Sequence, residues 1–267
     1  MPGEQHRNPV LDTSVPHVAR MYNYWLGGKD NFAADRAAGD LAVQVDPLMP
    51  MSVRANRAFL ARVVRYLAGE AGIRQFLDIG TGIPSADNTH EVAQAVAPDS
   101  RIVYVDNDPI VLSHARALLT SAPDGECAYL DADLREPGRV LGRAAQTLDF
   151  SRPVAVMLIA IMHCIPDQDD PYGIVTRLTD ALAPGSFVAL SHPARDLNTR
   201  ARAQMSTQVN AMMKAPVTLR DRAQVERFFD GLDLVEPGVV VVPKWRPDSE
   251  FAASSPAWVW GGVGQIR

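Results

Sequence analysis

The chain has 267 residues, of which 47% are hydrophobic and 21% are charged, with a formal net charge of -5. These values suit a globular protein of one large domain or one domain with an extension, and the acidic balance argues against a nucleic acid as the main partner. Its two cysteines, Cys127 and Cys164, belong to no CxxC pair, so we expect neither a disulfide framework nor a bound metal. No window approaches the roughly 18 apolar residues of a membrane span, and the N-terminus lacks a signal-peptide core, so we expect a cytoplasmic protein without a membrane partner.

The first seventy residues predict a tail followed by a helical cap. Residues 1–15 are polar and predict a loosely attached tail. Between residues 18 and 25, apolar side chains recur every three or four positions, which predicts an amphipathic helix. The glycine pair at 27 and 28 ends this helix, a second helix follows from about residue 32, and residues 52–68 predict a third.

From residue 75 the chain alternates between strand and helix. Strands are predicted over residues 75–80, 101–106, 126–133, 153–160 and 186–193. Helices are predicted over residues 87–97, 109–120, 136–147, 171–183, 198–213 and 221–230. This alternation predicts an α/β fold with a doubly wound, mostly parallel sheet. Residues 234–242 and 257–263 add two strands joined by a non-helical linker, which predicts an antiparallel terminal strand, seven strands in all, and a core over 71–267 behind a cap over 1–70.

A glycine-rich turn follows the first predicted strand, in the stretch QFLDIGTGIPS. Gly80 and Gly82 allow a sharp turn and a close approach of the backbone to a ligand. In open α/β sheets ligands bind outside the carboxyl ends of the strands. The turn is therefore a candidate nucleotide site, although glycine at such a position also serves packing alone.

Two further strands end in acidic residues. Asp106 ends the second strand, where a carboxylate accepts hydrogen bonds from both hydroxyls of a ribose. The alternative for Asp106 is a cap on the helix that starts at Pro109, a role that Asp108 fits better. Asp133 follows the third strand and is placed for an adenine amino group, with the N–H of the next residue facing a ring nitrogen; its alternative is a helix N-cap. Asp131 lies one period away and points elsewhere.

These motifs together resemble those of the class I S-adenosylmethionine-dependent methyltransferases. DIGTGIPS is similar to their first motif, YVDNDP to the second, DADLREP to the third and LIAIMHCIPD to the fourth, over residues 57–267. A more specific resemblance spans nearly the whole chain. MYNYWLGGKDNFAADR, DIGTGIPSADNTHEVAQ and the closing WVWGGVG are similar to the actinobacterial DUF574 family of S-adenosyl methyltransferases.

The resemblance implies a Rossmann-like methyltransferase fold, S-adenosyl-L-methionine as the cofactor and a small molecule as the methyl acceptor. It implies neither the identity of the acceptor nor an oligomeric state. The residues that it places at the cofactor are Asp78, Gly80, Thr81, Gly82, Asp106, Asn107, Asp133, Leu134 and Ala160. Pro84 stands where a third glycine is common; it removes an N–H and counts against a pyrophosphate cradle and NAD.

The N-terminal motif supplies candidate substrate contacts. Tyr22, Tyr24, Lys29 and Asn31 place several polar groups around the glycine pair, and a cap over the strand ends excludes water from the site. Aromatic faces also stabilise a nearby sulfonium cation. The alternative is a pair of helices that pack on the sheet with their tyrosines half buried.

His163 follows the fourth strand, and the resemblance places it near the transferring methyl group. There it is a candidate general base toward an oxygen or nitrogen nucleophile, with packing or loop ordering as the alternative. Methyl transfer needs mainly positioning and desolvation, so it requires no catalytic side chain. Two other functions stay open: a non-catalytic or regulatory protein that binds S-adenosylmethionine, and a dinucleotide-dependent oxidoreductase.

Overall fold

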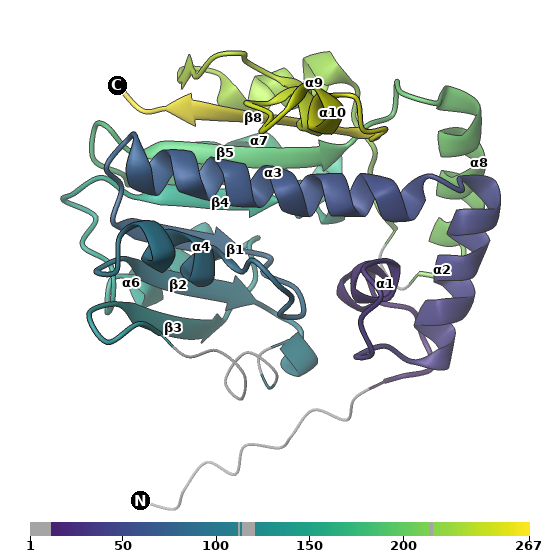
Figure 1. Ribbon diagram of the computed structural model, residues 1–267. Coiled ribbons are helices and arrows are strands. Elements are labelled where there is room, and N and C mark those ends of the chain that lie inside the picture. Colours follow the sequence, from purple (N-terminus) through teal and green to yellow (C-terminus); the bar gives the residue numbers. More distant parts are fainter. Residues whose placement is uncertain (1–11, 112, 114–120, 214–215) are drawn as a thin grey trace, which may run out of the picture.

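The sheet of this computed structural model has eight strands in the order β3-β2-β1-β4-β5-β8-β6, and β7 also pairs with β8 (Figure 1). The structure describes residues 12–111, 113, 121–213 and 216–267. The predicted tail up to residue 11 and most of the helix predicted over 109–120 lie outside the described residues.

Five neighbouring strands are parallel, and the described bounds lie close to the predicted ones. They are β1 (Gln75–Ile79), β2 (Arg101–Asp106), β3 (Glu126–Asp131), β4 (Ala155–Ile159) and β5 (Phe187–Pro193). β8 (Val259–Gln265) runs antiparallel to β5 and completes the predicted antiparallel edge. The predicted fold class is confirmed.

The sheet has eight strands instead of the predicted seven because the stretch 234–242 is broken. It forms two short strands, β6 (Asp233–Leu234) and β7 (Val240–Val241), which both pair antiparallel with β8. Between them Pro237 offers no N–H to the sheet, and Gly238 has a φ of +80° and donates to the Val235 carbonyl over 2.9 Å. The residues that were expected to extend one strand form a turn instead.

Helices cover both faces of the sheet, as Figure 1 shows. One face carries α3 (Met49–Gly69) and α4 (Thr89–Val96). The other carries α6 (Pro137–Ala144), α7 (Pro171–Thr179) and α9 (Arg222–Glu226). α3 is buried along one apolar stripe, which includes Phe59, Val63 and Leu67 and packs on Phe76 and Met157 of the sheet.

The remaining helices are short or lie beyond one end of the sheet. α1 (Val18–Trp25), α2 (Ala33–Val45), α8 (Thr199–Asn210) and the start of α3 gather at the carboxyl ends of the parallel strands (Figure 1). Short helical turns complete the fold: η1 (Met162–Cys164), η2 (Asp167–Asp169), η3 (Arg227–Phe229), η4 (Val242–Lys244) and α10 (Glu250–Ala253). Among the described residues, no helix has the length and apolarity that a membrane span requires.

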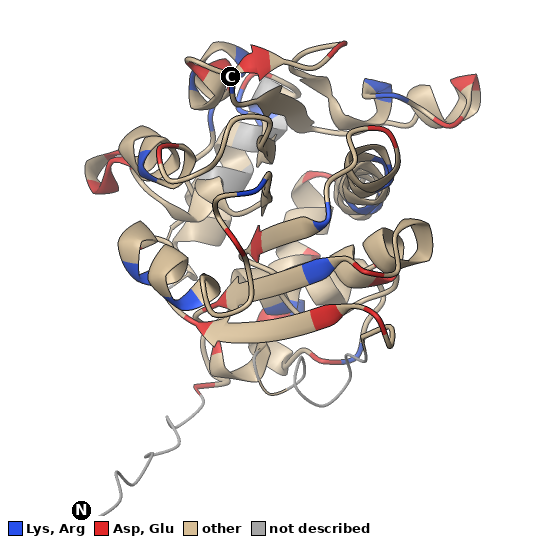
Figure 2. Ribbon diagram, turned by 90° about the vertical axis from the view of Figure 1, so that its left-hand side faces the viewer, with Lys and Arg blue, Asp and Glu red and all other residues tan. Residues whose placement is uncertain are grey.

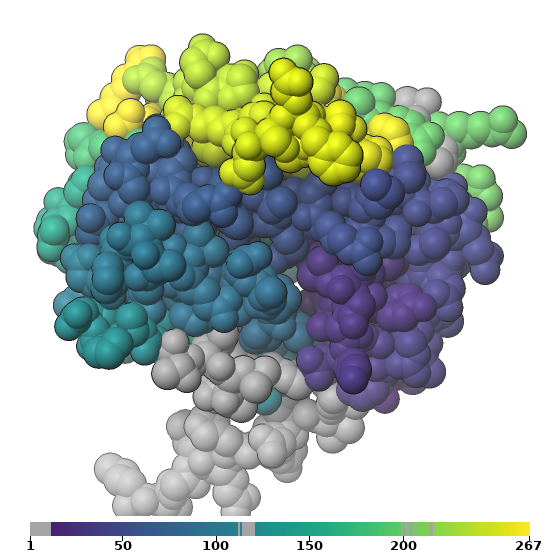
Figure 3. Space-filling view, in the orientation of Figure 1, coloured from purple at the N-terminus to yellow at the C-terminus, as the bar shows by residue number. Residues whose placement is uncertain are grey.

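The cap is joined to the core rather than separate from it. A third apolar cluster unites Met21 of α1, Ala38 and Ala42 of α2, Val53 of α3 and Val209 of α8. In Figure 3 the N-terminal segment, in purple, lies directly against the neighbouring parts of the chain. Because α3 packs on the sheet and also enters the cap, the division at residue 70 stays a prediction. Figure 2 shows acidic and basic residues interspersed over the opposite end of the molecule.

Candidate functional site

The glycine turn, residues 80–82, follows β1 in a backbone conformation that favours glycine. Gly80 has a φ of +75° and Gly82 a φ of +67°. A Cβ on Gly80 would lie 2.4 Å from the Ile161 side chain, whereas a Cβ on Gly82 would meet nothing within 4 Å. Gly80 is therefore required for packing against the loop after β4, and Gly82 leaves space in which a ligand can approach the backbone.

Asp78 lies on β1 beneath this turn with 5% of its surface exposed. Thr89 donates a hydrogen bond of 2.6 Å to its carboxylate. Burial raises the pKa of Asp78 to about 6, against the opposing effects of the Thr89 hydrogen bond and the nearby Arg57 guanidinium. The fold thus keeps a carboxylate at a position where its charge is costly.

Arg57 of α3 is a site residue that sequence reasoning missed. Its guanidinium donates to the carbonyl oxygens of Ala86 (2.8 Å) and Asp87 (2.9 Å), which ties α3 to the loop beyond the glycine turn. Its Nε is buried and has no hydrogen-bond partner among the described residues. The arginine therefore places a cation at the edge of the turn, and its Nε–H is a donor without a described partner.

Asp106 ends β2 and joins the two loops at this edge of the sheet. Its carboxylate accepts from the Gly82 N–H and from the Asp108 N–H, each over 2.9 Å. Burial raises its pKa, and these two backbone hydrogen bonds oppose that rise. Since each carboxylate oxygen accepts about two hydrogen bonds, each keeps one lone pair for a ligand. Asp108 caps the next segment through the Ile110 N–H (2.8 Å), the role expected of it.

The polar groups beyond β3 are linked to one another. Asn107 donates to Asp133 over 3.3 Å, and Asp133 also accepts from the Arg135 N–H at 2.9 Å. The Arg135 guanidinium lies 3.3 Å from Asp133 and 2.7 Å from Asp169. Asp133 does not cap α6, whose N-cap is Glu136, and Leu134 is buried. Asp133 therefore sits beside Asn107 at the edge where an adenine is expected.

The end of β4 is held in an uncommon conformation. Ala160 has a φ of +52°, which is rare for a residue with a Cβ, and its N–H donates to both oxygens of Ser191. The loop that follows is fastened by Arg220, whose side chain is wholly buried. Its guanidinium donates to the Met162 and Ile165 carbonyl oxygens, both at 2.9 Å, and to Asp167 at 2.6 Å.

His163 lies in this loop, between Met162 and Ile165, whose carbonyl oxygens accept from Arg220. Its Nδ1 is buried without a hydrogen-bond partner in the described part of the chain. Burial and the Arg220 guanidinium lower the pKa of His163 to about 4, so the ring is neutral at pH 7. The ring of His192 packs edge-on with a centroid separation of 6.1 Å, and burial lowers its pKa as well.

A cavity of about 120 Å³ adjoins His163 and is called the cap cavity. The residues that line it are Val18, Met21, Tyr22, Trp25, Ala42, Met49, Ser52, Val53, Asn56, Ala160, His163, Pro193, Val209, Asn210, Met213, Val217, Leu219, Trp258 and Val259. They come from α1, α2, α3, α8 and the segment after it, from η1, and from the ends of β4, β5 and β8. The cap cavity thus lies between the helical cap and the carboxyl end of the sheet.

Of the four predicted substrate contacts, the structure brings only Tyr22 into the lining of the cap cavity. Tyr24 instead donates to Asp40 of α2 over 2.7 Å, and Lys29 is exposed. Asn31 donates to the Asn23 side chain (3.0 Å) and to the Gly28 carbonyl (2.9 Å). These contacts give Tyr24 and Asn31 roles in the fold of the cap itself.

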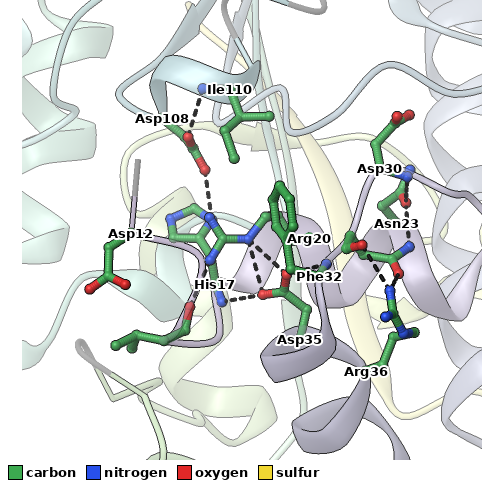
Figure 4. Close-up of polar contacts among 12 residues, drawn as sticks. Asp12, His17, Arg20, Asn23, Asp30, Phe32, Asp35, Arg36, Asp108 and Ile110 are labelled. Carbon is green, nitrogen blue, oxygen red and sulfur yellow. Dashed lines mark hydrogen bonds and ion pairs between the residues drawn. The ribbon is translucent and has the colours of Figure 1, made fainter. Parts of the chain in front are cut away.

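A buried ion pair joins α1 to α2 within the cap, and His17 beside it reaches the segment after β2 (Figure 4). The Arg20 side chain donates to the fully buried Asp35 carboxylate over 2.9 Å, and the same carboxylate accepts from the His17 and Phe32 N–H groups. His17 in turn places Nδ1 3.1 Å from the Asp108 carboxylate. Asp35 and Phe32 of the N-terminal motif therefore help to hold the start of α1, and His17 brings it beside Asp108.

A family model described as S-adenosyl methyltransferase matches residues 4–267 of the chain. No curated protein matches this chain. A DUF574 family protein from Streptomyces avermitilis is 46% identical, with a TM-score of 0.92 over 96% of this chain and 99% of that one. A candidate methyltransferase from Thermobifida fusca is 40% identical, with a TM-score of 0.88 over 99% and 100% of the two chains.

A more distant structure shares the fold. The plantazolicin methyltransferase BpumL, solved in complex with SAH, is 11% identical with a TM-score of 0.50, over 93% of this chain and 95% of that one. The family match covers the turn after β1, the acidic ends of β2 and β3, and the cap. The chain belongs to the S-adenosyl methyltransferase family, whose methyl donor is S-adenosylmethionine.

Proposed function

We propose that the protein transfers the methyl group of S-adenosylmethionine to a small molecule held in the cap cavity. The position of that cavity carries the proposal. Ala160 and His163 line it, and the loop that contains them packs through Ile161 against Gly80 of the glycine turn. An acceptor in the cavity is therefore next to the group that occupies the turn. Family membership gives the dinucleotide alternative no support.

The residues at the strand ends fit this cofactor. Gly82 leaves open space beside the backbone, and Asp106 keeps a free lone pair on each oxygen for the two ribose hydroxyls. Asp133, Asn107 and the Leu134 N–H are placed for the adenine edge. The bound cofactor supplies a methyl group on a positively charged sulfur.

Arg57 adds a contact for the amino-acid end of the cofactor, which carries a carboxylate. Its buried, unpartnered Nε lies at the loop that extends the glycine turn. Arginine is suited to carboxylates because its planar fork presents several donors. Thr81 donates to the Asp78 carbonyl over 3.3 Å and so orders the turn, and in this proposal the Asp78 carboxylate serves the amino-acid end through water or by ordering the turn.

His163 is the group placed to take the acceptor's proton. With a pKa lowered to about 4 it is neutral at pH 7, and its buried Nδ1 has no other partner in the described chain. A base with so low a pKa does not remove the proton in advance. It accepts the proton while the nucleophile donates its electron pair to the methyl carbon. The cap supplies the other contribution, because it excludes water from the reacting atoms.

The experiment is a labelled transfer. Purified protein is incubated with S-adenosylmethionine that carries ¹³C in its methyl group and with fractionated small-molecule extract, and products are identified by mass spectrometry. A labelled product that is lost in His163→Gln and Asp106→Asn supports the proposal. Binding of S-adenosylhomocysteine without any labelled product in any fraction supports a non-catalytic binder instead.

A further inference from the structure

The cap cavity contains a second polar recognition point, on α3. Asn56 has 1% of its surface exposed, lines the cavity and has an Oδ1 with no hydrogen-bond partner among the described residues. A buried amide oxygen left unpaired is costly, so native structures satisfy such atoms with protein, water or ligand. The orphan atom belongs to a side chain that lines a cavity, and this combination points to a ligand.

The orientation of the Asn56 amide follows from its neighbour. Tyr22 donates its only hydroxyl proton to the Val53 carbonyl over 3.3 Å. The Tyr22 oxygen must therefore accept from the amide, and the Asn56 Nδ2 donates to it over 3.0 Å. This leaves the Asn56 Oδ1 as the free atom, and an amide oxygen accepts hydrogen bonds but never donates them. The ligand must therefore bring an N–H or O–H.

The rest of the lining limits the size and charge of that ligand. In the described lining, Ser52, Asn56 and Asn210 are polar but do not ionise. The ionisable side chains of that lining are Tyr22 and His163. Burial raises the pKa of Tyr22 and lowers that of His163, so both are neutral at pH 7. A charged ligand finds no counter-charge among these described lining residues and loses its hydration. A cavity of about 150 Å³ holds benzene in another protein, so the 120 Å³ of the cap cavity limits the ligand to one ring at most.

We propose, resting on the function above, that the methyl acceptor is a neutral, single-ring aromatic molecule with an N–H or O–H that Asn56 Oδ1 accepts. Met21, Trp25 and Trp258 surround the ring with apolar and aromatic surface. His163 faces the same cavity and meets the reacting oxygen or nitrogen. Asn56 selects the acceptor and His163 takes its proton, so the two polar groups have separate tasks.

The test compares ligands of matched size. We titrate 4-methylphenol, its isomer anisole, and benzoate into protein saturated with S-adenosylhomocysteine, and follow binding by NMR. The first two have the same atoms, but only 4-methylphenol carries a donor. We expect it to bind about fivefold tighter than anisole, as one hydrogen bond to an otherwise unpaired buried atom implies, and benzoate not to bind. Equal binding of the two isomers, or tighter binding of benzoate, would overturn the proposal.

Two variants test whether Asn56 causes the preference for 4-methylphenol over anisole. In Asn56→Leu the two isomers should bind within about twofold of each other. In Met213→Leu, a volume-conserving change in the same lining, the preference should persist. A preference that survives Asn56→Leu contradicts the assignment, and the wild-type comparison stands even where that variant does not fold. Absence of S-adenosylhomocysteine binding would instead refute the proposed function. The three ring compounds would then be titrated into the protein without S-adenosylhomocysteine, and the same comparison would test Asn56.

Discussion

Asp78→Asn removes a charge that the fold holds at a cost. Burial raises the pKa of Asp78 from an ordinary 3.8 to about 6, and the side chain is 5% exposed. The gap between these values corresponds to about 3 kcal/mol. The sign follows from linkage: because the folded protein holds the proton more tightly, the penalty is absent below pH 3.8, grows as the pH rises toward 6 and is complete above it.

Asparagine cannot ionise, so the variant escapes this penalty. The free energy of unfolding of Asp78→Asn minus that of wild type should therefore increase by about 2 to 3 kcal/mol between pH 4 and pH 8. Urea unfolding followed by tryptophan fluorescence at several pH values in this range measures the difference. Asp131→Asn, which removes an exposed carboxylate at the end of β3, is the matched control. A difference for Asp78→Asn that stays constant across this range would show that burial does not raise the pKa of Asp78.

Three further predictions concern the arginines and His163. Arg57→Met should weaken binding of S-adenosylhomocysteine about tenfold and leave 5′-methylthioadenosine, which lacks the carboxylate, unchanged in calorimetry; equal losses would contradict the assignment. With the pKa of His163 lowered to about 4, kcat should persist at pH 5, where a histidine of ordinary pKa is mostly charged, and a fall centred near pH 6.5 would disagree. Arg220→Met should cost about 3 to 5 kcal/mol in urea unfolding, because four acceptors lose a fully buried donor, against less than about 1 kcal/mol for the exposed Arg195→Met; similar costs would exclude the structural role.

The cofactor edge could be predicted because parallel topology brings separate motifs together. Apolar runs ending in Asp106 and near Asp133 predict strands, and parallel strands present their carboxyl ends at one edge of the sheet. Asp108 could be assigned as the cap because it stands just before Pro109, where a helix can begin. Each of these inferences needs only local sequence and one rule of topology.

The buried arginine could not be found in this way. Arg220 and Arg222 stand two positions apart in the polar stretch TLRDRAQ, yet Arg220 is wholly buried and Arg222 is exposed. The difference arises because Arg220 pairs with Ala194, just after β5, and its guanidinium reaches the carbonyls after β4. No periodicity in the sequence encodes that contact.

Two other differences left a signal in the sequence. Asn56 stands on the same helical face as Phe59 and Val63, and a polar residue on a buried stripe indicates a special environment. The dipeptide Pro237–Gly238 indicates a turn inside the predicted sixth strand. In the N-terminal motif, by contrast, polar residues such as Asn31 looked like ligand contacts because a buried turn and a ligand site both need many hydrogen bonds.

The most direct test of the account is a calorimetric titration of S-adenosylhomocysteine into wild-type protein, Asp106→Asn and the control Asp131→Asn, which lies opposite Asp106 on β3. We expect one site per chain, affinity at least about tenfold weaker in Asp106→Asn because two charge-assisted hydrogen bonds to the ribose are weakened, and no change in the control. Wild-type protein that is folded by circular dichroism and does not bind, or Asp106→Asn that binds as tightly as wild type, would contradict it.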